Sequence, residues 1–281
     1  MVPASKKQVA RYIVYLVDKL SPSSILQYIN VIRILHLEKG YDNPLQSYYV
    51  TSLLQGIKRE HAAPPAQKLP ITPKILLAMY HVLDLSIPAC ITFWAAALIA
   101  FYSFFRKSTL LPKLGAFSPE SDLCIGDLQK SPKGYLLTVK HTKTIQFRQK
   151  LLQIPLPLIP GSPLCPSRAL TALLRQLAPF PPKTPLFSYP VRDTYRSLHH
   201  QSFSIALKSA LNKAGYQASK YSGHSFRRGG ASFAFSCGIP ADLIKIQGDW
   251  SSDAYLRYLS SPVSQRQKLL DSVSSHIIKI K

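Results

Sequence analysis

Apolar side chains recur every three or four positions from the N-terminus to about residue 60, a period that predicts a compact set of helices. Ser5 and Gln8 have capping-box spacing, so we expect a first helix to begin there. Ser21-Pro22 predicts the start of a second helix and Gly40 its end. A third helix is expected from about 44 to 58. The first two apolar faces are Val9, Ile13, Leu16 and Leu20, and Ile25, Ile29, Ile32 and His36.

A segment rich in Pro and small residues, 63–70, has the character of an interdomain linker. We therefore expect a small helical domain at 1–62 and a larger domain at 71–281. In the larger domain, Thr72-Pro73 predicts the start of a helix, and the stretch 89–105 is almost entirely apolar. That stretch contains Thr92 and Ser103 and is slightly short for a membrane span, so we interpret it as a buried core helix.

The helical period gives way to an alternating one after Lys133-Gly134, a turn signal. One strand is predicted at 135–140 and a second near 151–156, which together form a small antiparallel sheet with Lys143 near the tip of a hairpin. The Pro-rich stretch 179–190 is expected to be a loop with a short strand at Leu186-Phe187. Further helices are expected at 167–177, 200–213, 224–236, 240–247 and 253–260. The predicted fold class is mainly α with a small antiparallel β-sheet.

The charge balance indicates a polyanionic partner, with nucleic acid first among the candidates. Lys and Arg number 35 against 13 Asp and Glu, a formal net charge of +22, while a hydrophobic content of 46% excludes a disordered basic tail. So few acids disfavour a metal-dependent nuclease or transposase, which needs clustered carboxylates. The candidates for DNA contact are Lys6, Lys7, Arg33, Lys58 and Arg59 in the first domain, and Lys140, Arg148, Lys150, Lys208, Lys213 and Lys220 in the second.

The cysteines Cys90, Cys124, Cys165 and Cys237 lie far apart and form no CxxC pair. This spacing disfavours zinc fingers and disulfide frameworks and fits a reducing compartment, with each thiol a small core residue.

Two motifs carry cations suited to a phosphodiester. His224 and Arg227 are three positions apart at the expected start of a helix, where free backbone N–H groups favour a phosphate. Arg106 follows the apolar stretch, so we expect its guanidinium at the edge of the core, where bidentate phosphate binding is strong. Each feature alone also has a structural interpretation: a capping His beside a solvated Arg, and an Arg that extends out of a buried helix.

The segment 248–258 sets Trp250 in a turn and places Tyr255 and Tyr258 three positions apart on a short helix. A tyrosine can attack a phosphodiester if cations stabilise the pentavalent transition state and an acid protonates the leaving oxygen. Because the chain has 15 tyrosines, most of them must be packing residues.

Taken in order, these motifs resemble those of the tyrosine recombinase (phage integrase) family, most closely the recombinases of eukaryotic Crypton- and DIRS-type mobile elements. The resemblance covers nearly the whole chain and implies a core-binding (SAM-like) DNA-binding domain followed by an α+β catalytic domain. The motifs are Phe-Phe-Arg106-Lys-Ser, Lys143-Thr-Ile-Gln, Ser-Gly-His224-Ser-Phe-Arg227-Arg-Gly-Gly-Ala and Gly-Asp-Trp250-Ser-Ser-Asp-Ala-Tyr-Leu-Arg-Tyr258.

The resemblance also implies a role for each residue. Arg106 and Arg227 would clamp the scissile phosphate, and His224 would assist in orienting it and in proton transfer. Lys143 would protonate the departing 5′ oxygen, and Trp250 would pack on the phosphate and donate a hydrogen bond to it.

Tyr258 would be the nucleophile, leaving a 3′-phosphotyrosyl bond and a free 5′-hydroxyl without a metal, ATP or another cofactor. Two positions depart from the family pattern. Thr109 stands where many members have an acidic residue, and the interval from Trp250 to Tyr258 is one residue shorter than in bacterial members, which leaves Tyr255 as a competing nucleophile. The apolar residues of the C-terminal tail are candidates to dock into a neighbouring protomer: Leu269, Leu270, Ile277 and Ile278.

The resulting hypothesis is a site-specific DNA recombinase or integrase of a mobile element, acting on double-stranded DNA as a tetramer, without a membrane and, by resemblance, in the nucleus. The main alternative is a catalytically inactive, domesticated DNA-binding relic. A topoisomerase of the same chemistry and a basic RNA-binding protein are further alternatives. The complete residue set argues against a relic, and the small helical N-terminal domain favours recombination over relaxation.

Overall fold

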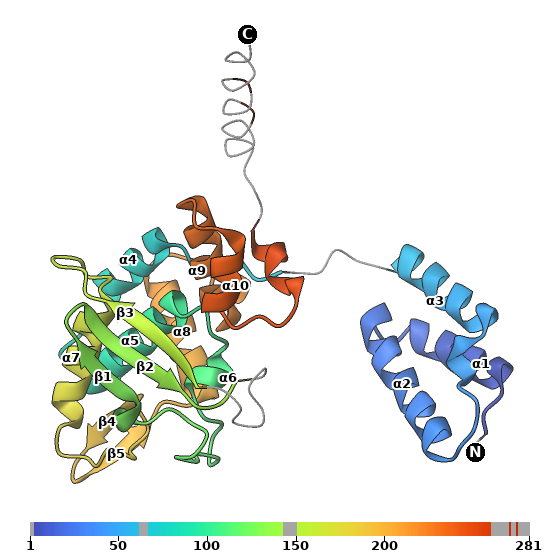
Figure 1. Ribbon diagram of the computed structural model, residues 1–281, viewed down its shortest axis with the longest axis horizontal. Helices are drawn as coiled ribbons and strands as arrows, with labels where there is room; N and C mark the ends of the chain where they lie inside the picture. Colours follow the sequence, from blue (N-terminus) through green and yellow to red (C-terminus); the bar gives the residue numbers. More distant parts are fainter. Residues whose placement is uncertain (1–2, 62–66, 143–150, 260–269, 271–273, 275–281) are drawn as a thin grey trace. The chain divides into compact units, whose positions relative to one another are not determined.

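The computed structural model describes residues 3–61, 67–142, 151–259, 270 and 274. The chain divides into two compact units, Met1–Gln67 and Lys68–Lys281, each with a hydrophobic core of its own (Figure 1). The boundary lies inside the segment 63–70 that was predicted as a linker.

The first unit consists of α1 (Lys6–Val17), α2 (Pro22–Glu38), the 3₁₀ turn η1 (Pro44–Gln46) and α3 (Tyr48–His61). Ser5 caps α1 with the expected capping box, and Ser21 caps α2. The third helix begins later than predicted. Asn43 caps η1 through Leu45, and Ser47 is extended and accepts a hydrogen bond from the N–H of Val50, so Pro44 starts a separate turn.

The second unit is built around α5 (Pro88–Tyr102), whose residues from Thr92 to Phe101 are all buried. Helices α7 (Pro166–Leu177) and α9 (His224–Ser236) pack against it. Most of the stretch 89–105 is therefore a core helix, as predicted, and none of the described helices has the length and apolar composition needed to span a bilayer. The other helical elements of this unit are α4 (Pro73–Val82), α6 (Lys107–Leu110), η2 (Ile125–Asp127), α8 (His200–Lys213), η3 (Ala218–Lys220), α10 (Ala241–Gln247) and η4 (Asp253–Tyr258).

An antiparallel sheet with the strand order β1-β2-β3 covers part of this core, from β1 (Leu128–Ser131), β2 (Gly134–Val139) and β3 (Leu152–Pro157). Leu137 of β2 pairs with Leu128 of β1 and with Ile154 of β3, and its side chain and that of Ile154 are buried. The predicted hairpin of β2 and β3 is confirmed, whereas β1 was not foreseen.

A second sheet pairs β4 (Ser188–Val191) with β5 (Thr194–Ser197), in place of the strand predicted at Leu186-Phe187. Leu186 and Phe187 are core residues instead. The residues of β5 are exposed or half-buried, so its sequence lacks the apolar alternation that marks a strand.

Two further predictions about this unit were wrong. Helix α5 ends at Tyr102 and not at residue 105, because Phe104 adopts a positive φ of 54°, which a helix cannot continue through. Cys237 is exposed and therefore not a core residue, whereas Cys124 and Cys165 are buried and Cys90 is half-buried; all four thiols are free.

Candidate active site

The N-terminal part of α9 lies against three other segments of the larger unit: the residues that follow α5, the turn after α10, and η4. Figure 1 shows α9 and α10 next to each other. Five of the predicted site residues belong to these segments: Arg106, His224, Arg227, Trp250 and Tyr258. The sixth, Lys143, lies outside the described residues.

Arg227 is the centre of the arrangement. It is only 1% exposed, and its Nη1 donates hydrogen bonds to the carbonyl oxygens of Phe104 and, at 2.8 Å, of Gly248. Its guanidinium lies 3.6 Å from the ring centroid of Trp250, a cation–π contact. Nε and Nη2 are buried, and neither has a hydrogen-bond partner among the residues that the structure describes. Buried N–H donors normally have a hydrogen-bond partner. These two donors are therefore well placed to bind the acceptor atoms of a ligand.

The two carbonyl groups that hold Arg227 belong to strained stretches of backbone. Phe104 has a φ of 54°, and Asp249, which follows Gly248, has a φ of 50°. Such values cost a non-glycine residue free energy and persist where the surroundings enforce them. The left-handed turns set the direction of both carbonyl groups and thereby fix the guanidinium.

Positive charge accumulates around this group. Burial lowers the pKa of Arg227 to about 9, and the charge of Arg106 acts in the same direction. Arg106 itself is half-buried and caps α6, where its carbonyl oxygen accepts a hydrogen bond from the N–H of Thr109. A bound anion would relieve this repulsion, so the site favours a ligand that carries negative charge.

His224, the first residue of α9, lies beside Tyr258, with 2.6 Å between its Nε2 and the tyrosine hydroxyl. Desolvation lowers the pKa of His224, and the charges of Arg227 and Arg106 lower it further. The imidazole is therefore neutral at pH 7, and with its proton on Nδ1 it accepts the hydrogen bond of the hydroxyl. Ser232 holds η4 on α9 by donating to the carbonyl oxygen of Tyr258 at 2.6 Å.

The two candidate tyrosines differ in their surroundings. Tyr255 is 7% exposed and packs on Trp250, with 5.8 Å between ring centroids, in a small apolar cluster with Phe104 and Ile244. Tyr258 is half-buried, and its hydroxyl lies at His224. The geometry thus gives Tyr258 a proton acceptor and gives Tyr255 a packing role.

Comparison with known proteins relates the whole chain to recombinases. None of the known family profiles matches it. It is 26% identical over 267 residues to the integrase/recombinase xerD homolog of Selenomonas ruminantium, which covers 92% of this chain and 74% of that protein. Its fold is similar to that of the XerH site-specific recombinase bound to palindromic difH substrate, with a TM-score of 0.64, 14% identity, and coverage of 97% of this chain and 72% of that one. The chain is similar in sequence to an integrase/recombinase homolog and similar in fold to solved recombinases.

Two further structures share this recombinase fold. The lambda integrase dimer bound to a COC′ core site has a TM-score of 0.60 at 14% identity, and the likeness covers 91% of this chain but 64% of that integrase. A complex of the Tn1549 transposon integrase with circular intermediate DNA has a TM-score of 0.61 at 11% identity, covering 96% of this chain and 86% of that one. The predicted fold class, mainly α with a small antiparallel β-sheet in a two-domain recombinase fold, is confirmed.

Sequence reasoning missed one contact of the candidate site. The hydroxyl of Thr142, three residues beyond β2, donates a 2.5 Å hydrogen bond to the carboxylate of Asp249. The sequence signal available for this contact was Asp249, an acid inside the motif that contains Gly248 and Trp250. Its partner could not be found from the sequence, because the two residues are far apart along the chain.

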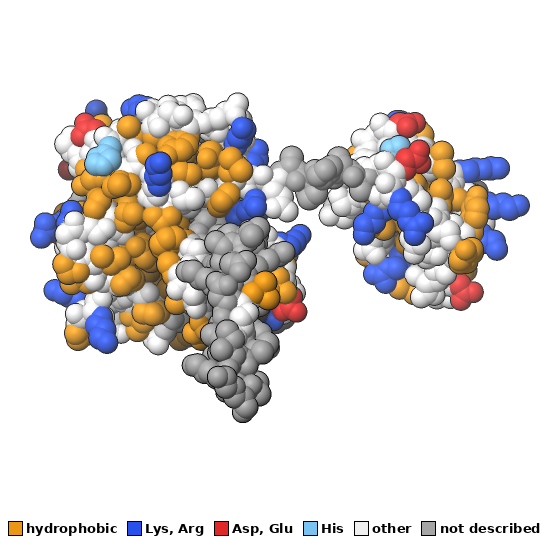
Figure 2. All heavy atoms as spheres, turned by 90° about the horizontal axis from the view of Figure 1, so that it is seen from above, with side chains coloured by type: hydrophobic (Ala, Val, Ile, Leu, Met, Phe, Trp, Pro, Cys, Tyr) orange, Lys and Arg blue, Asp and Glu red, His pale blue; other side chains and the backbone are white. Residues whose placement is uncertain are grey.

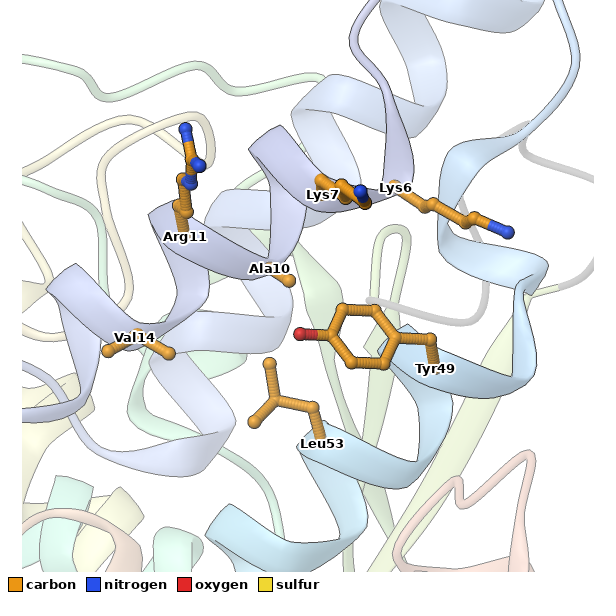
Figure 3. Close-up of a pocket in the computed structure, with 7 residues that line it drawn as sticks. All are labelled: Lys6, Lys7, Ala10, Arg11, Val14, Tyr49 and Leu53. Atoms are coloured by element: carbon orange, nitrogen blue, oxygen red, sulfur yellow. The ribbon is translucent and has the colours of Figure 1, made fainter.

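The basic residues predicted to contact DNA have varied surroundings. Lys140 forms a 2.8 Å ion pair with Asp127, and Arg148 and Lys150 lie outside the described residues. Lys6 and Lys7 line a groove of about 710 Å³ on the first unit, between the start of α1 and α3, together with Arg11 and Tyr49. Figure 3 shows the Tyr49 ring extending from α3 toward Ala10 of α1.

Proposed function

We propose that this protein is a site-specific DNA recombinase or integrase, which cuts and rejoins DNA strands through a 3′-phosphotyrosyl intermediate to integrate or excise a mobile element. The observation that carries the proposal is the pairing of Tyr258 with His224 beside buried Arg227, two of whose N–H groups have no partner in the described part of the chain. These groups offer a nucleophile, a proton acceptor and a phosphate clamp in one place.

In this proposal the scissile phosphate occupies the space in front of Arg227. Nε and Nη2 of that residue donate to the non-bridging oxygens, and Arg106 adds a second guanidinium. The guanidinium of Arg227 is fixed before the reaction, so it stabilises the extra charge of the pentavalent transition state without reorganising. The ring of Trp250 stacks on the guanidinium of Arg227 and, following the resemblance, also contacts the phosphate.

Cleavage then exchanges one ester bond for another. The hydroxyl of Tyr258 attacks phosphorus and gives its proton to His224, while the bond to the 5′ oxygen breaks. The departing oxygen takes a proton from Lys143, following the resemblance. The products are a 3′-phosphotyrosyl bond and a free 5′-hydroxyl. Attack by the 5′-hydroxyl of a partner strand reverses the step, so the proposed reaction consumes no ATP.

The proposed partner is double-stranded DNA, bound by both units. The net charge of +22 and the basic groove of Lys6, Lys7 and Arg11 support it. Strand exchange joins two duplexes and requires several protomers, so we propose a tetramer on DNA. Figure 2 shows apolar side chains gathered on one face of the larger unit. Apolar residues exposed on α9, α10 and η4 offer a surface for contact between copies: Phe233, Leu243, Ile246 and Leu256.

The element type and the compartment rest on the resemblance alone. The motif from Gly248 to Tyr258 supports a Crypton- or DIRS-type element, and such an element implies the nucleus.

Covalent trapping tests the proposal. Nicked duplexes from the DNA that flanks the gene, labelled at the 5′ end, are incubated with the protein in EDTA and run on denaturing gels. We expect a labelled adduct with the wild type and with Tyr255→Phe, and none with Tyr258→Phe. Binding with a steep salt dependence but no adduct would instead favour the DNA-binding relic. Loss of the adduct in Tyr255→Phe alone would retain the chemistry and refute the assignment of Tyr258.

A further inference from the structure

Asp249 lies where the sheet meets the turn that holds Arg227. Its carboxylate accepts the 2.5 Å hydrogen bond of Thr142, whose side chain is buried just beyond the end of β2. A hydrogen bond to an ionised acceptor is roughly twice as strong as one between neutral groups. The contact therefore fastens the turn after α10 to the sheet, across a long interval of sequence.

The backbone of Asp249 carries this restraint to Arg227. The peptide group between Gly248 and Asp249 presents the carbonyl oxygen that accepts from Nη1 of Arg227 at 2.8 Å. The positive φ of Asp249, 50°, sets the direction of that peptide group. Gly248 lies against the ring of Trp250, where a side chain would not fit: a Cβ there would lie 1.8 Å from Cζ3 of Trp250. A displaced Asp249 would thus turn the carbonyl away from the guanidinium.

The charge of Asp249 acts on the same residue. It raises the pKa of Arg227, in opposition to burial and to the charge of Arg106. Thr109, at the position where the family pattern has an acid, cannot supply a carboxylate. Asp249 thus brings negative charge to a site that is otherwise dominated by guanidinium groups.

We propose that Asp249 is a positioning residue of the recombination site: held by Thr142, it orients the Gly248 carbonyl and so fixes the guanidinium of Arg227 for the scissile phosphate. This inference rests on the proposed function. It assigns Thr142 and Asp249 no contact with the reacting atoms.

The test measures the rate of adduct formation on a duplex that the wild type cleaves. Thr142→Val removes the hydroxyl at nearly constant volume, and Asp249→Gly removes the carboxylate while tolerating the positive φ. We expect each to slow the reaction by about 10- to 100-fold, a loss of the size found when the residues that orient metal ligands are removed. The double variant should be no slower than Asp249→Gly, because both changes break one link. Thr142→Ser should restore the rate.

A second substrate separates positioning from general damage to the fold. In a duplex with a methylphosphonate at the scissile position, one non-bridging oxygen and its charge are missing, so cleavage depends less on Arg227. A variant that acts through Arg227 should lose less rate on this substrate than on the phosphodiester. The matched control is Asp253→Asn, which removes an exposed carboxylate of η4 paired with Lys245 and should leave both rates unchanged.

Equal losses on the two substrates, additive effects in the double variant, or a wild-type rate for Thr142→Val would each overturn the inference. If the wild type forms no adduct with any duplex, the proposed function fails first. If the wild type forms the adduct and Thr142→Val and Asp249→Gly form it at the same rate, the inference is refuted and the proposed function is not.

Discussion

Replacement of Trp250 tests how the core of the site holds Arg227. Trp250 is 7% exposed, and its ring contacts the guanidinium at 3.6 Å and packs near Phe104, Tyr255 and Tyr258, with ring centroids 6.4, 5.8 and 6.1 Å away. Trp250→Ala would remove all of these contacts and open a cavity, which costs about 3–5 kcal/mol for a buried aromatic residue. Trp250→Phe keeps an apolar ring but weakens the cation–π contact, so we expect a loss of about 1–2 kcal/mol.

Urea unfolding followed by tryptophan fluorescence measures this loss in the larger unit. Both tryptophans of the chain, Trp94 and Trp250, belong to that unit, so Trp94 reports its unfolding in the variants. Leu256→Ala is the control, since Leu256 is 51% exposed and should cost no more than about 0.5 kcal/mol. If Trp250→Ala were as stable as this control, the account of a packed, Trp-braced Arg227 would be refuted.

Three further predictions concern pH, packing and DNA binding. His224 has a lowered pKa, so the free energy of unfolding and the rate of adduct formation should be constant above its ordinary value of 6.5 and fall as the pH drops through the lower folded-state value; pH-dependent denaturation and trapping measure this. Gly229→Ala should destabilise the larger unit by several kcal/mol or prevent its folding, because the added Cβ would lie 1.8 Å from the carbonyl oxygen of Ile71. Lys7→Gln should weaken binding to any duplex and reduce the slope of log K against log salt by about 0.9.

Each of these has a matched control. The pH dependence of adduct formation should persist in His200→Gln and disappear in His224→Gln. Burial also lowers the pKa of His200, so the rate of adduct formation, and not the free energy of unfolding, separates the two histidines. Gly56→Ala has nothing within 4 Å of the new Cβ and should stabilise α3 by about 0.5–1 kcal/mol in a calorimetric measurement. Lys140→Gln should leave the salt slope intact, because Lys140 is paired with Asp127. A reversed result in any pair would contradict the corresponding assignment.

Local signals in the sequence sufficed for most helices of the fold. Ser5, Ser21 and Thr72 cap the starts of helices, as the sequence predicted, because capping depends only on neighbouring residues. The end of α5 was predicted wrongly, because the turn at Phe104 presents its carbonyl oxygen to Arg227, a residue far along the chain. The polar strand β5 was missed because its pairing with β4, and not its own pattern, makes it a strand.

The site could be assembled from the sequence as a set of residues but not as a structure. The motif around His224 and Arg227 is compatible with a solvated arginine at a helix end. Arg227 is buried because the carbonyl groups of Phe104 and Gly248 accept its hydrogen bonds. No local sequence pattern predicts that these two carbonyl groups lie close together. The hydrogen bond between Thr142 and Asp249 is equally non-local.

Peptide mapping of the trapped adduct tests the central claim most directly. The wild-type protein is incubated with the nicked duplex in EDTA, digested with a nuclease and a protease, and the remaining nucleotide is located by mass spectrometry. We expect a 3′-nucleotide on the hydroxyl of Tyr258, the residue that lies 2.6 Å from His224. A nucleotide on Tyr255 or on any other residue, or a tightly bound duplex without a covalent product, would contradict the account.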